Sequence, residues 1–103
     1  LKQAFSVTYG RYPIGHLSSI PAEDYESIHG GYDTTAVNAD PNRLVPLDEL
    51  RRLEQEGYIG SIHPEFFTTC GIGTNVESSK AIGQGIAADL RSAEVDYALL
   101  TST

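Results

Sequence analysis

The stretch GTNVESSKAIGQGIAADLRSAEVDYALLTST, residues 73–103, decides the fold that the sequence predicts. Ile82, Ile86 and Leu90 recur at every fourth position, which is the spacing of the buried stripe of an amphipathic helix. The apolar residues that follow are typical of a strand buried on both faces of a sheet, and they are Val95, Tyr97, Ala98, Leu99 and Leu100. The stretch therefore predicts a helix that leads into a strand of a parallel sheet.

A further helix is expected upstream, over residues 46–56, where leucines recur at three-residue spacing and Gly57 marks the end. The polar residues expected on its outer side are Arg51, Arg52, Glu54 and Gln55. In the second helix, Gly83 and Gly85 lower the helix propensity and allow close packing on a sheet.

With a strand expected around residues 58–62, residues 46–103 read as helix, strand, helix and strand, and the last three form a βαβ unit with a right-handed crossover. The predicted fold class is α/β: a small Rossmann-like parallel sheet, incomplete at both ends. Residues 1–45 are less regular. In them, AFSVTY (4–9) predicts a short strand or extended arm, and residues 29–43 predict a long loop. The whole chain is interpreted as a single domain.

The composition excludes several classes of protein. The net charge of −7, from 14 acidic and 7 basic residues, argues against nucleic acid and anionic membranes as partners. No apolar run approaches the roughly 20 residues of a membrane span, and the first residues do not have the layout of a signal peptide. With a single cysteine the chain forms no internal disulfide, so a cytoplasmic location is expected. The absence of methionine predicts that the sequence is a segment of a larger protein.

Polar residues follow two predicted strands, at the edge of a parallel sheet where ligands usually bind. One group is the turn CGIGTN (70–75), and the other is the tail LTST (100–103). In one βαβ unit both groups lie on the same rim. The residues singled out there for substrate binding are Gly71, Gly73, Thr74, Asn75 and Ser102.

The turn at residues 71–73 precedes a helix that is expected to begin near Asn75, with Thr74 and Glu77 as a capping box. Free backbone N–H groups at such a helix end favour an anion, for example a substrate carboxylate. A turn that only caps the helix explains the same residues, so both interpretations stay open. Cys70 is either a favoured thiolate beside the helix or a small buried apolar group.

The segment HGGYD (29–33) is the second candidate cluster, because it combines a proton carrier, a carboxylate and two glycines that let a ligand approach closely. Its catalytic candidates are His29 and Asp33, and its substrate-binding candidates are Gly30, Gly31 and Tyr32. A plain turn, in which Asp33 caps backbone groups and His29 packs, is the alternative.

No metal site is predicted. His16 and His63 have no cysteine or acidic partners at the spacing of a zinc site. Four residues match part of the spacing of a calcium loop, but Arg43 stands where that loop needs glycine, so turn chemistry explains them better. They are Asn38, Asp40, Asn42 and Glu49.

Taken together, the motifs keep the order and spacing of one family. They are YGRYPI (9–14), HGGYD (29–33), NADPNRLVPLDELRRLEQEGYIG (38–60), GTNVESSKAIGQGIAADL (73–90) and VDYALLTST (95–103). Over roughly residues 9–103 the chain resembles the selenoprotein B component of glycine/sarcosine/betaine reductase. It is similar, less closely, to the selenoprotein subunit of D-proline reductase.

The resemblance implies that a catalytic selenocysteine, followed by a Gly-Thr-Cys segment, comes immediately after Thr103. Selenocysteine is encoded by UGA, so we expect that the sequence stops where this codon was read as a stop. The codon after Thr103 tests this hypothesis, because any codon other than UGA would remove it. Thr103 is accordingly grouped with the catalytic residues, and the chain as given is expected to be inactive alone.

The resemblance also implies a mechanism for an anaerobic amino-acid reductase. The amine is activated as an imine-type adduct on a pyruvoyl group of another subunit, a selenolate attacks the α-carbon, and the amine leaves. A small selenoprotein A receives the product. The substrate carboxylate is assigned to the turn at residues 71–75, and His29 and Asp33 are assigned to the departing amine. Cys70 matches no catalytic residue of the family, and an incomplete sheet edge would favour a homodimer.

Two rival functions stay open at this point. One is a subunit of the D-proline reductase type, in which the same nucleophile opens a ring. The other is a non-catalytic interaction module whose HGGYD segment docks on a partner subunit.

Overall fold

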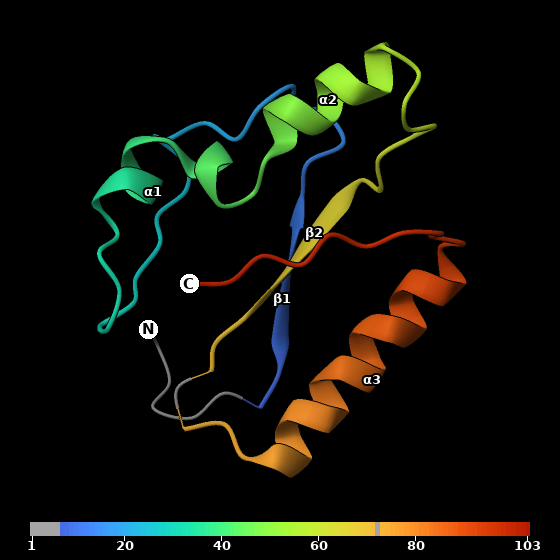
Figure 1. The fold of residues 1–103 in the computed structure, drawn as a ribbon. Coiled ribbons are helices and arrows are strands. Elements are labelled where there is room, and N and C mark those ends of the chain that lie inside the picture. The colour runs from blue at the N-terminus through green and yellow to red at the C-terminus, as the bar shows by residue number, and fades with distance from the viewer. Residues whose placement is uncertain (1–6, 72) are drawn as a thin grey trace. The chain divides into compact units, whose positions relative to one another are not determined.

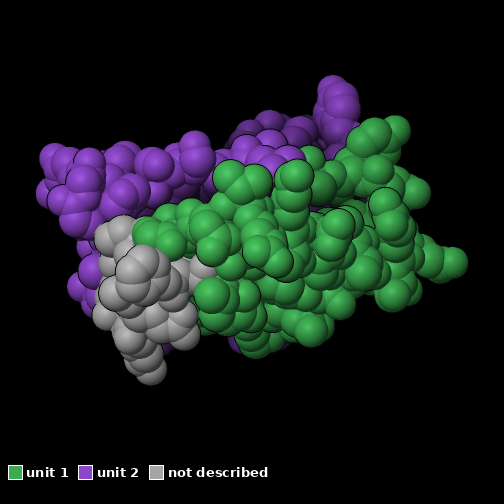
Figure 2. Space-filling model, turned by 90° about the horizontal axis from the view of Figure 1, so that it is seen from below, with its two compact units in different colours: residues 1–13, 65–98 green, residues 14–64, 99–103 purple. Residues whose placement is uncertain are grey.

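The chain divides into two compact units, which Figure 2 colours separately, in a computed structural model that describes residues 7–103 apart from Ile72. The first unit consists of residues 7–13 and 65–98 without Ile72, and the second consists of Ile14–Pro64 and Leu99–Thr103. This division differs from the one that the sequence indicated, with a less regular part over residues 1–45 and a helix–strand core over residues 46–103. The single-domain interpretation stays a prediction.

Two antiparallel strands form the sheet of the first unit, β1 (Tyr9–Pro13) and β2 (Glu65–Thr69) (Figure 1). The register places Tyr12 opposite Phe66, and their rings stack with centroids 5.3 Å apart. Aromatic pairs of this kind are a main stabilising element of an antiparallel pair. Of the strand or arm predicted over residues 4–9, residues 4–6 lie outside the described part of the chain.

Helix α3 (Val76–Ser92) follows β2 and confirms the second predicted helix. It approaches β1 closely at Gly85, where a Cβ atom would lie only 2.9 Å from Cε1 of Tyr9. The Tyr9 hydroxyl donates a hydrogen bond of 2.5 Å to Asp89 on the next turn of the helix. Gly83, in contrast, has nothing within 4 Å of such an atom, so only one of the two glycines serves close packing. Among the described residues, no helix is long and apolar enough to cross a membrane.

The strand predicted over residues 95–100 is not formed, and this segment carries no regular secondary structure. Tyr97 is 93% exposed and Leu100 is 88% exposed. A buried strand needs neighbours on both sides, and the sheet found in the described residues has only β1 and β2. The Rossmann-like parallel sheet therefore stays a prediction. Of the elements predicted for its βαβ unit, the helix is confirmed as α3.

The second unit contains the helices α1 (Thr35–Ala39), η1 (Pro41–Arg43, a 3₁₀ turn) and α2 (Leu47–Gln55). Its buried apolar residues are Ile14, Ile20, Val37 and Leu47. The first two helices fall in the segment predicted to be a long loop. They were missed because each is short and is preceded by an aspartate, Asp33 or Asp40, that accepts the N–H two residues on, which also fits a plain turn.

Helix α2 confirms the helix predicted over residues 46–56, to within one residue at each end. Gly57 ends it in the left-handed conformation, with a φ of 81°. The N–H of Tyr58 returns to the carbonyl of Leu53, which completes a Schellman motif. The strand predicted around residues 58–62 is wrong, because the chain turns at this point and leaves Tyr58 77% exposed.

Arg51 was expected on the outer side of α2, and this prediction is wrong, since its side chain is only 17% exposed. Its guanidinium donates to the carbonyls of Leu17, at 2.9 Å, and Ile14, at 3.0 Å. It also pairs with Glu54 at 3.2 Å, and Glu54 in turn accepts the N–H of Ile62. This pair therefore connects α2 to two irregular segments of the second unit.

Candidate functional site

Two predicted catalytic residues of the second unit, His29 and Thr103, are in direct contact. Nδ1 of His29 lies 2.7 Å from Oγ1 of Thr103, although 74 positions separate them in the sequence. A hydroxyl at this distance is a full hydrogen-bond partner for an imidazole nitrogen. The contact therefore joins the HGGYD segment to the tail in which the second polar group was predicted.

The imidazole of His29 is also supported on one face. The ring of Tyr32 stacks on it, with centroids 5.9 Å apart and an interplanar angle of 28°. The N–H of Tyr32 donates to the carbonyl of His29 at 3.3 Å, which closes the turn through the two glycines. Tyr32 thus contacts His29 and supports its ring. Its predicted contact with a substrate stays a prediction.

The segment that carries His29 is attached to α1 through one asparagine. Asn38 accepts the N–H of Ser27 at 2.7 Å and donates to the carbonyl of Ser27 at 3.2 Å. Asn42 engages both backbone groups of Ile20 in the same way, at 2.9 and 3.0 Å. The asparagine side chains thus form the hydrogen bonds that a neighbouring strand would otherwise offer to the backbone N–H and C=O groups of these irregular segments. These contacts reach backbone groups 11 and 22 positions away, so they are long-range hydrogen bonds and differ from the turn chemistry predicted for Asn38 and Asn42.

Asp33, the third predicted catalytic residue, serves α1. Its Oδ1 accepts the N–H of Thr35 at 3.0 Å. These hydrogen bonds from Thr35 hold the pKa of the Asp33 carboxyl below its usual range, so it is a carboxylate at neutral pH. Within the described residues, no hydrogen bond or ion pair joins Asp33 to His29, which matches the capping alternative considered for this residue.

The turn after β2, in the first unit, lines a hollow of about 310 Å³. Its lining residues are Thr69, Cys70, Gly71, Thr74, Ser79, Ile82, Gly83 and Ile86. Three hydroxyl groups and an apolar floor fit a small amphipathic molecule. Two of the predicted binding residues, Gly71 and Thr74, belong to this lining, whereas Gly73 and Asn75 do not. Cys70 is half-buried and is a free thiol.

The predicted capping box of α3 is wrong by one position. Asn75 caps the helix, because its Oδ1 accepts the N–H of Ser78 at 2.7 Å. Thr74 instead donates to the carbonyl of Cys70 at 3.0 Å. Gly73 has a φ of 65°, a conformation that favours glycine, so its place in the turn is conformational. The asparagine cap occupies one N–H that an anion would otherwise use.

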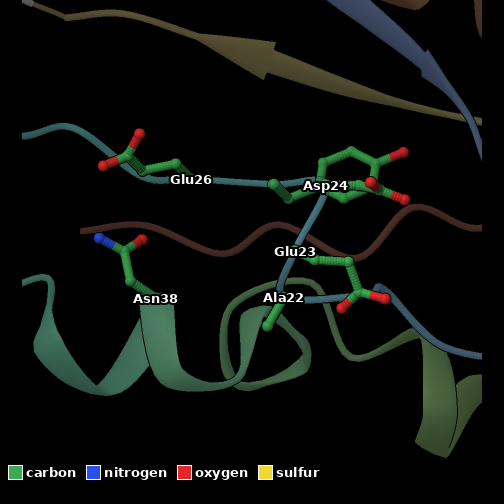
Figure 3. Close-up of a pocket in the computed structure, with 6 residues that line it drawn as sticks. Ala22, Glu23, Asp24, Glu26 and Asn38 are labelled. Carbon is green, nitrogen blue, oxygen red and sulfur yellow. The ribbon is translucent and has the colours of Figure 1, made fainter.

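An acidic hollow of about 400 Å³ in the second unit was not predicted as a site. Its lining residues are Ala22, Glu23, Asp24, Tyr25, Glu26 and Asn38. Figure 3 shows that the carboxylates of Glu23, Asp24 and Glu26 spread apart instead of converging on one point. In the part of the chain that the structure describes, no group of three or more His, Cys, Asp or Glu residues could hold a metal ion.

Comparison with known proteins identifies relatives over the whole sequence. The family model of glycine/sarcosine/betaine reductase selenoprotein B matches residues 1–103. The glycine reductase complex component B subunit gamma of Symbiobacterium thermophilum is 46% identical over 95 residues, which is 92% of this chain and 22% of that protein. The sarcosine reductase complex component B subunit beta of Peptoclostridium acidaminophilum is 42% identical over 103 residues, 100% of this chain and 24% of that protein.

A more distant relative is the D-proline reductase subunit gamma of Acetoanaerobium sticklandii, which is 39% identical over 75 residues, 72% of this chain and 31% of that protein. No solved structure matches the chain. The chain spans less than a quarter of the length of the glycine and sarcosine reductase subunits that it resembles.

Proposed function

Because the chain belongs to the glycine/sarcosine/betaine reductase selenoprotein B family, we propose that it is part of an amino-acid reductase subunit that cleaves the C–N bond of a glycine-type amine. The names of the relatives describe components of reductase complexes, which supports an oxidoreductase subunit that acts with partner subunits. The substrates and partners of the whole protein are part of the proposal.

Two groups outside this chain supply the chemistry of the proposed reaction. A selenocysteine, expected after Thr103, provides the nucleophile, and a pyruvoyl group on a partner subunit activates the amine. The described residues fit this placement, because Thr103 is exposed and its hydroxyl contacts an imidazole that can hold or move a proton.

The proposed roles of this chain are proton transfer and substrate binding. For a primary or secondary amine such as glycine or sarcosine, His29 gives a proton to the nitrogen that departs when the C–N bond breaks, since such an amine leaves far more easily in its protonated form. Binding of a carboxylate by the turn at residues 71–75, with the hydroxyl groups of its hollow, is a separate proposal for the first unit. Asp33 acts on the position of α1 and no longer has a direct role at the nitrogen.

The single observation that carries this proposal is the hydrogen bond between His29 and Thr103. It connects the segment HGGYD with the last residue before the expected nucleophile, and these are two of the motifs on which the family resemblance rests. A titratable group in this place has a chemical use in the proposed reaction, whereas a docking module has no need of one.

The test uses the whole protein together with its partner subunits. Mass spectrometry measures the substrate-dependent alkylation of the residue after Thr103 in wild type, His29→Asn and the control His16→Asn. We expect His29→Asn to slow alkylation by about 100-fold or more, as for the loss of a general acid, while His16→Asn follows wild type. Alkylation that proceeds at the wild-type rate without His29 would reject its proposed role.

A ring-opening function of the D-proline reductase type is the second candidate, and the match to that subunit over 72% of this chain supports it. The same alkylation assay separates the two when it is run with glycine, sarcosine, betaine and D-proline in parallel. Alkylation with D-proline alone would replace the first proposal, and alkylation with none of them would favour the interaction module.

A further inference from the structure

The two nitrogens of His29 have different surroundings, and this difference assigns them different tasks in the proposed function, on which this inference rests. Nδ1 is held by Thr103 at 2.7 Å, and one face of the ring is covered by Tyr32. Within the described residues, no hydrogen bond is found at Nε2. The imidazole is therefore held at Nδ1 and on one face, and Nε2 has no hydrogen-bond partner among the described residues.

Nε2 lies beside Gly31. A Cβ atom on Gly31 would stand 3.9 Å from Nε2, whereas a Cβ atom on Gly30 would have nothing within 4 Å. Neither glycine has the positive φ that is found at Gly57 and Gly73, so the backbone itself tolerates a side chain at both positions. A side chain at position 31 would begin in van der Waals contact with Nε2, so a branched residue there would reduce the space beside this nitrogen.

A threonine hydroxyl can donate a hydrogen bond to Nδ1 or accept one from it. Only one of these two hydrogen bonds is kept when His29 gains or loses a proton. The imidazolium form carries an N–H on both nitrogens, so a hydroxyl that donates to Nδ1 loses its acceptor whenever His29 is protonated. A hydroxyl that accepts from Nδ1–H keeps its hydrogen bond in both states, and the proton then enters and leaves at Nε2.

We propose that Thr103 is a positioning residue whose hydroxyl accepts the Nδ1–H of His29, so that Nε2, beside Gly31, is the atom that exchanges a proton with the substrate. Thr103 acts through His29 and does not itself touch the reacting atoms. Tyr32 keeps the ring plane in place. This assignment gives separate tasks to four residues of one cluster.

The first experiment measures the neutral tautomer of His29 by nitrogen-15 NMR of the whole protein labelled in histidine, at about pH 8, where an ordinary imidazole is neutral. We expect the Nδ1–H form at His29 in wild type. Thr103→Val should shift the tautomer ratio about fivefold toward the Nε2–H form, which corresponds to the loss of one ordinary hydrogen bond. Thr101→Val removes the same hydroxyl two positions earlier and should leave the ratio unchanged.

The second experiment measures access to Nε2 by the rate at which diethyl pyrocarbonate modifies His29, read by peptide mass spectrometry. Gly31→Val should remove most of this reactivity, whereas Gly30→Val should retain it. His16 and His63 serve as internal references, so a variant that fails to fold is recognised by a general change in rates.

The outcomes separate this inference from the proposed function. An Nε2–H tautomer in wild type, a ratio that Thr103→Val does not move, or equal effects of the two glycine variants would overturn the positioning role, whatever the activity. If the tautomer and the access are as expected but His29→Asn leaves alkylation unchanged, the geometry of His29 holds and its part in the proposed function fails.

Discussion

The two units of this chain satisfy their backbone groups in different ways. In the first unit, β1 and β2 pair backbone with backbone, and α3 contacts β1 through Tyr9 and Asp89. In the second unit, irregular segments are bound by side chains, above all those of Arg51, Asn38 and Asn42. In a pair of strands, the stabilisation is shared among many backbone hydrogen bonds. Where one side chain binds several backbone groups, the loss of that side chain removes all of these hydrogen bonds at once. Single substitutions should therefore affect the second unit more strongly.

Arg51→Met should give the largest effect, because it removes the guanidinium that binds the carbonyls of Leu17 and Ile14 and pairs with the carboxylate of Glu54. We expect a loss of about 3 kcal/mol in local stability. The measurement is hydrogen exchange of residues 14–20 in the whole protein. Arg52→Met is the matched control, since its side chain is 50% exposed, and it should cost less than about 1 kcal/mol. Equal losses would contradict the difference between the two units.

Asn38→Ala should loosen the segment before His29, because both hydrogen bonds to Ser27 disappear. The expected loss is about 2 kcal/mol, read as faster hydrogen exchange over residues 27–33. The matched variant in the first unit is Asn75→Ala, which removes one cap of α3 and should cost about 1 kcal/mol. A larger effect at Asn75 would reverse the comparison.

Substitutions of Gly83 and Gly85 in α3 test whether this helix packs closely on Tyr9 of β1. Gly83→Ala should stabilise the helix by about 0.5–1 kcal/mol, because the new methyl group meets nothing within 4 Å and helix propensity rises. Gly85→Ala should instead destabilise it by about 1 kcal/mol, since the methyl group would collide with the ring of Tyr9. Hydrogen exchange of α3 measures both, and a gain in stability at both positions would show that Tyr9 does not hold this helix.

The smallest effect is expected at high pH. The hydrogen bond to Asp89 is the main cause that raises the pKa of Tyr9. A raised pKa means that the contribution of Tyr9 to stability is complete below the ordinary tyrosine pKa of about 10 and is lost as the pH rises through the folded value. Tyr9→Phe should remove this part of the alkaline loss, measured as the pH dependence of hydrogen exchange in β1. Tyr97→Phe, whose ring is 93% exposed, should follow wild type.

Regular patterns in the sequence predicted the parts of the fold that depend on local interactions. The four-residue spacing of Ile82, Ile86 and Leu90 predicted α3, and Gly57 predicted the end of α2. The strands predicted around residues 58–62 and over residues 95–100 were not found, because an apolar run identifies a strand only when a neighbouring strand is present to pair with it. The pairing of β2 with β1 was not predicted, since the paired residues lie more than fifty positions apart in the sequence.

The candidate site shows the same limit. The motif HGGYD identified His29, but the periodicity and turn signals gave no reason for it to meet Thr103, 74 positions away. The roles of Asn38 and Arg51 were missed as well, since a polar residue on a short helix has the same sequence signal whether it faces solvent or binds a distant carbonyl. A motif names the residue types that chemistry needs, and it does not identify their contacts.

The sequence by itself determined the family, the two longer helices and the residue types of the site, because these follow from nearest neighbours along the chain and from the order of motifs. Only the tertiary structure decided which strands pair, which arginine is buried and which nitrogen of His29 is held. Those choices depend on groups that are far apart in the sequence, and their free energies are set by burial and hydrogen bonding in the folded chain.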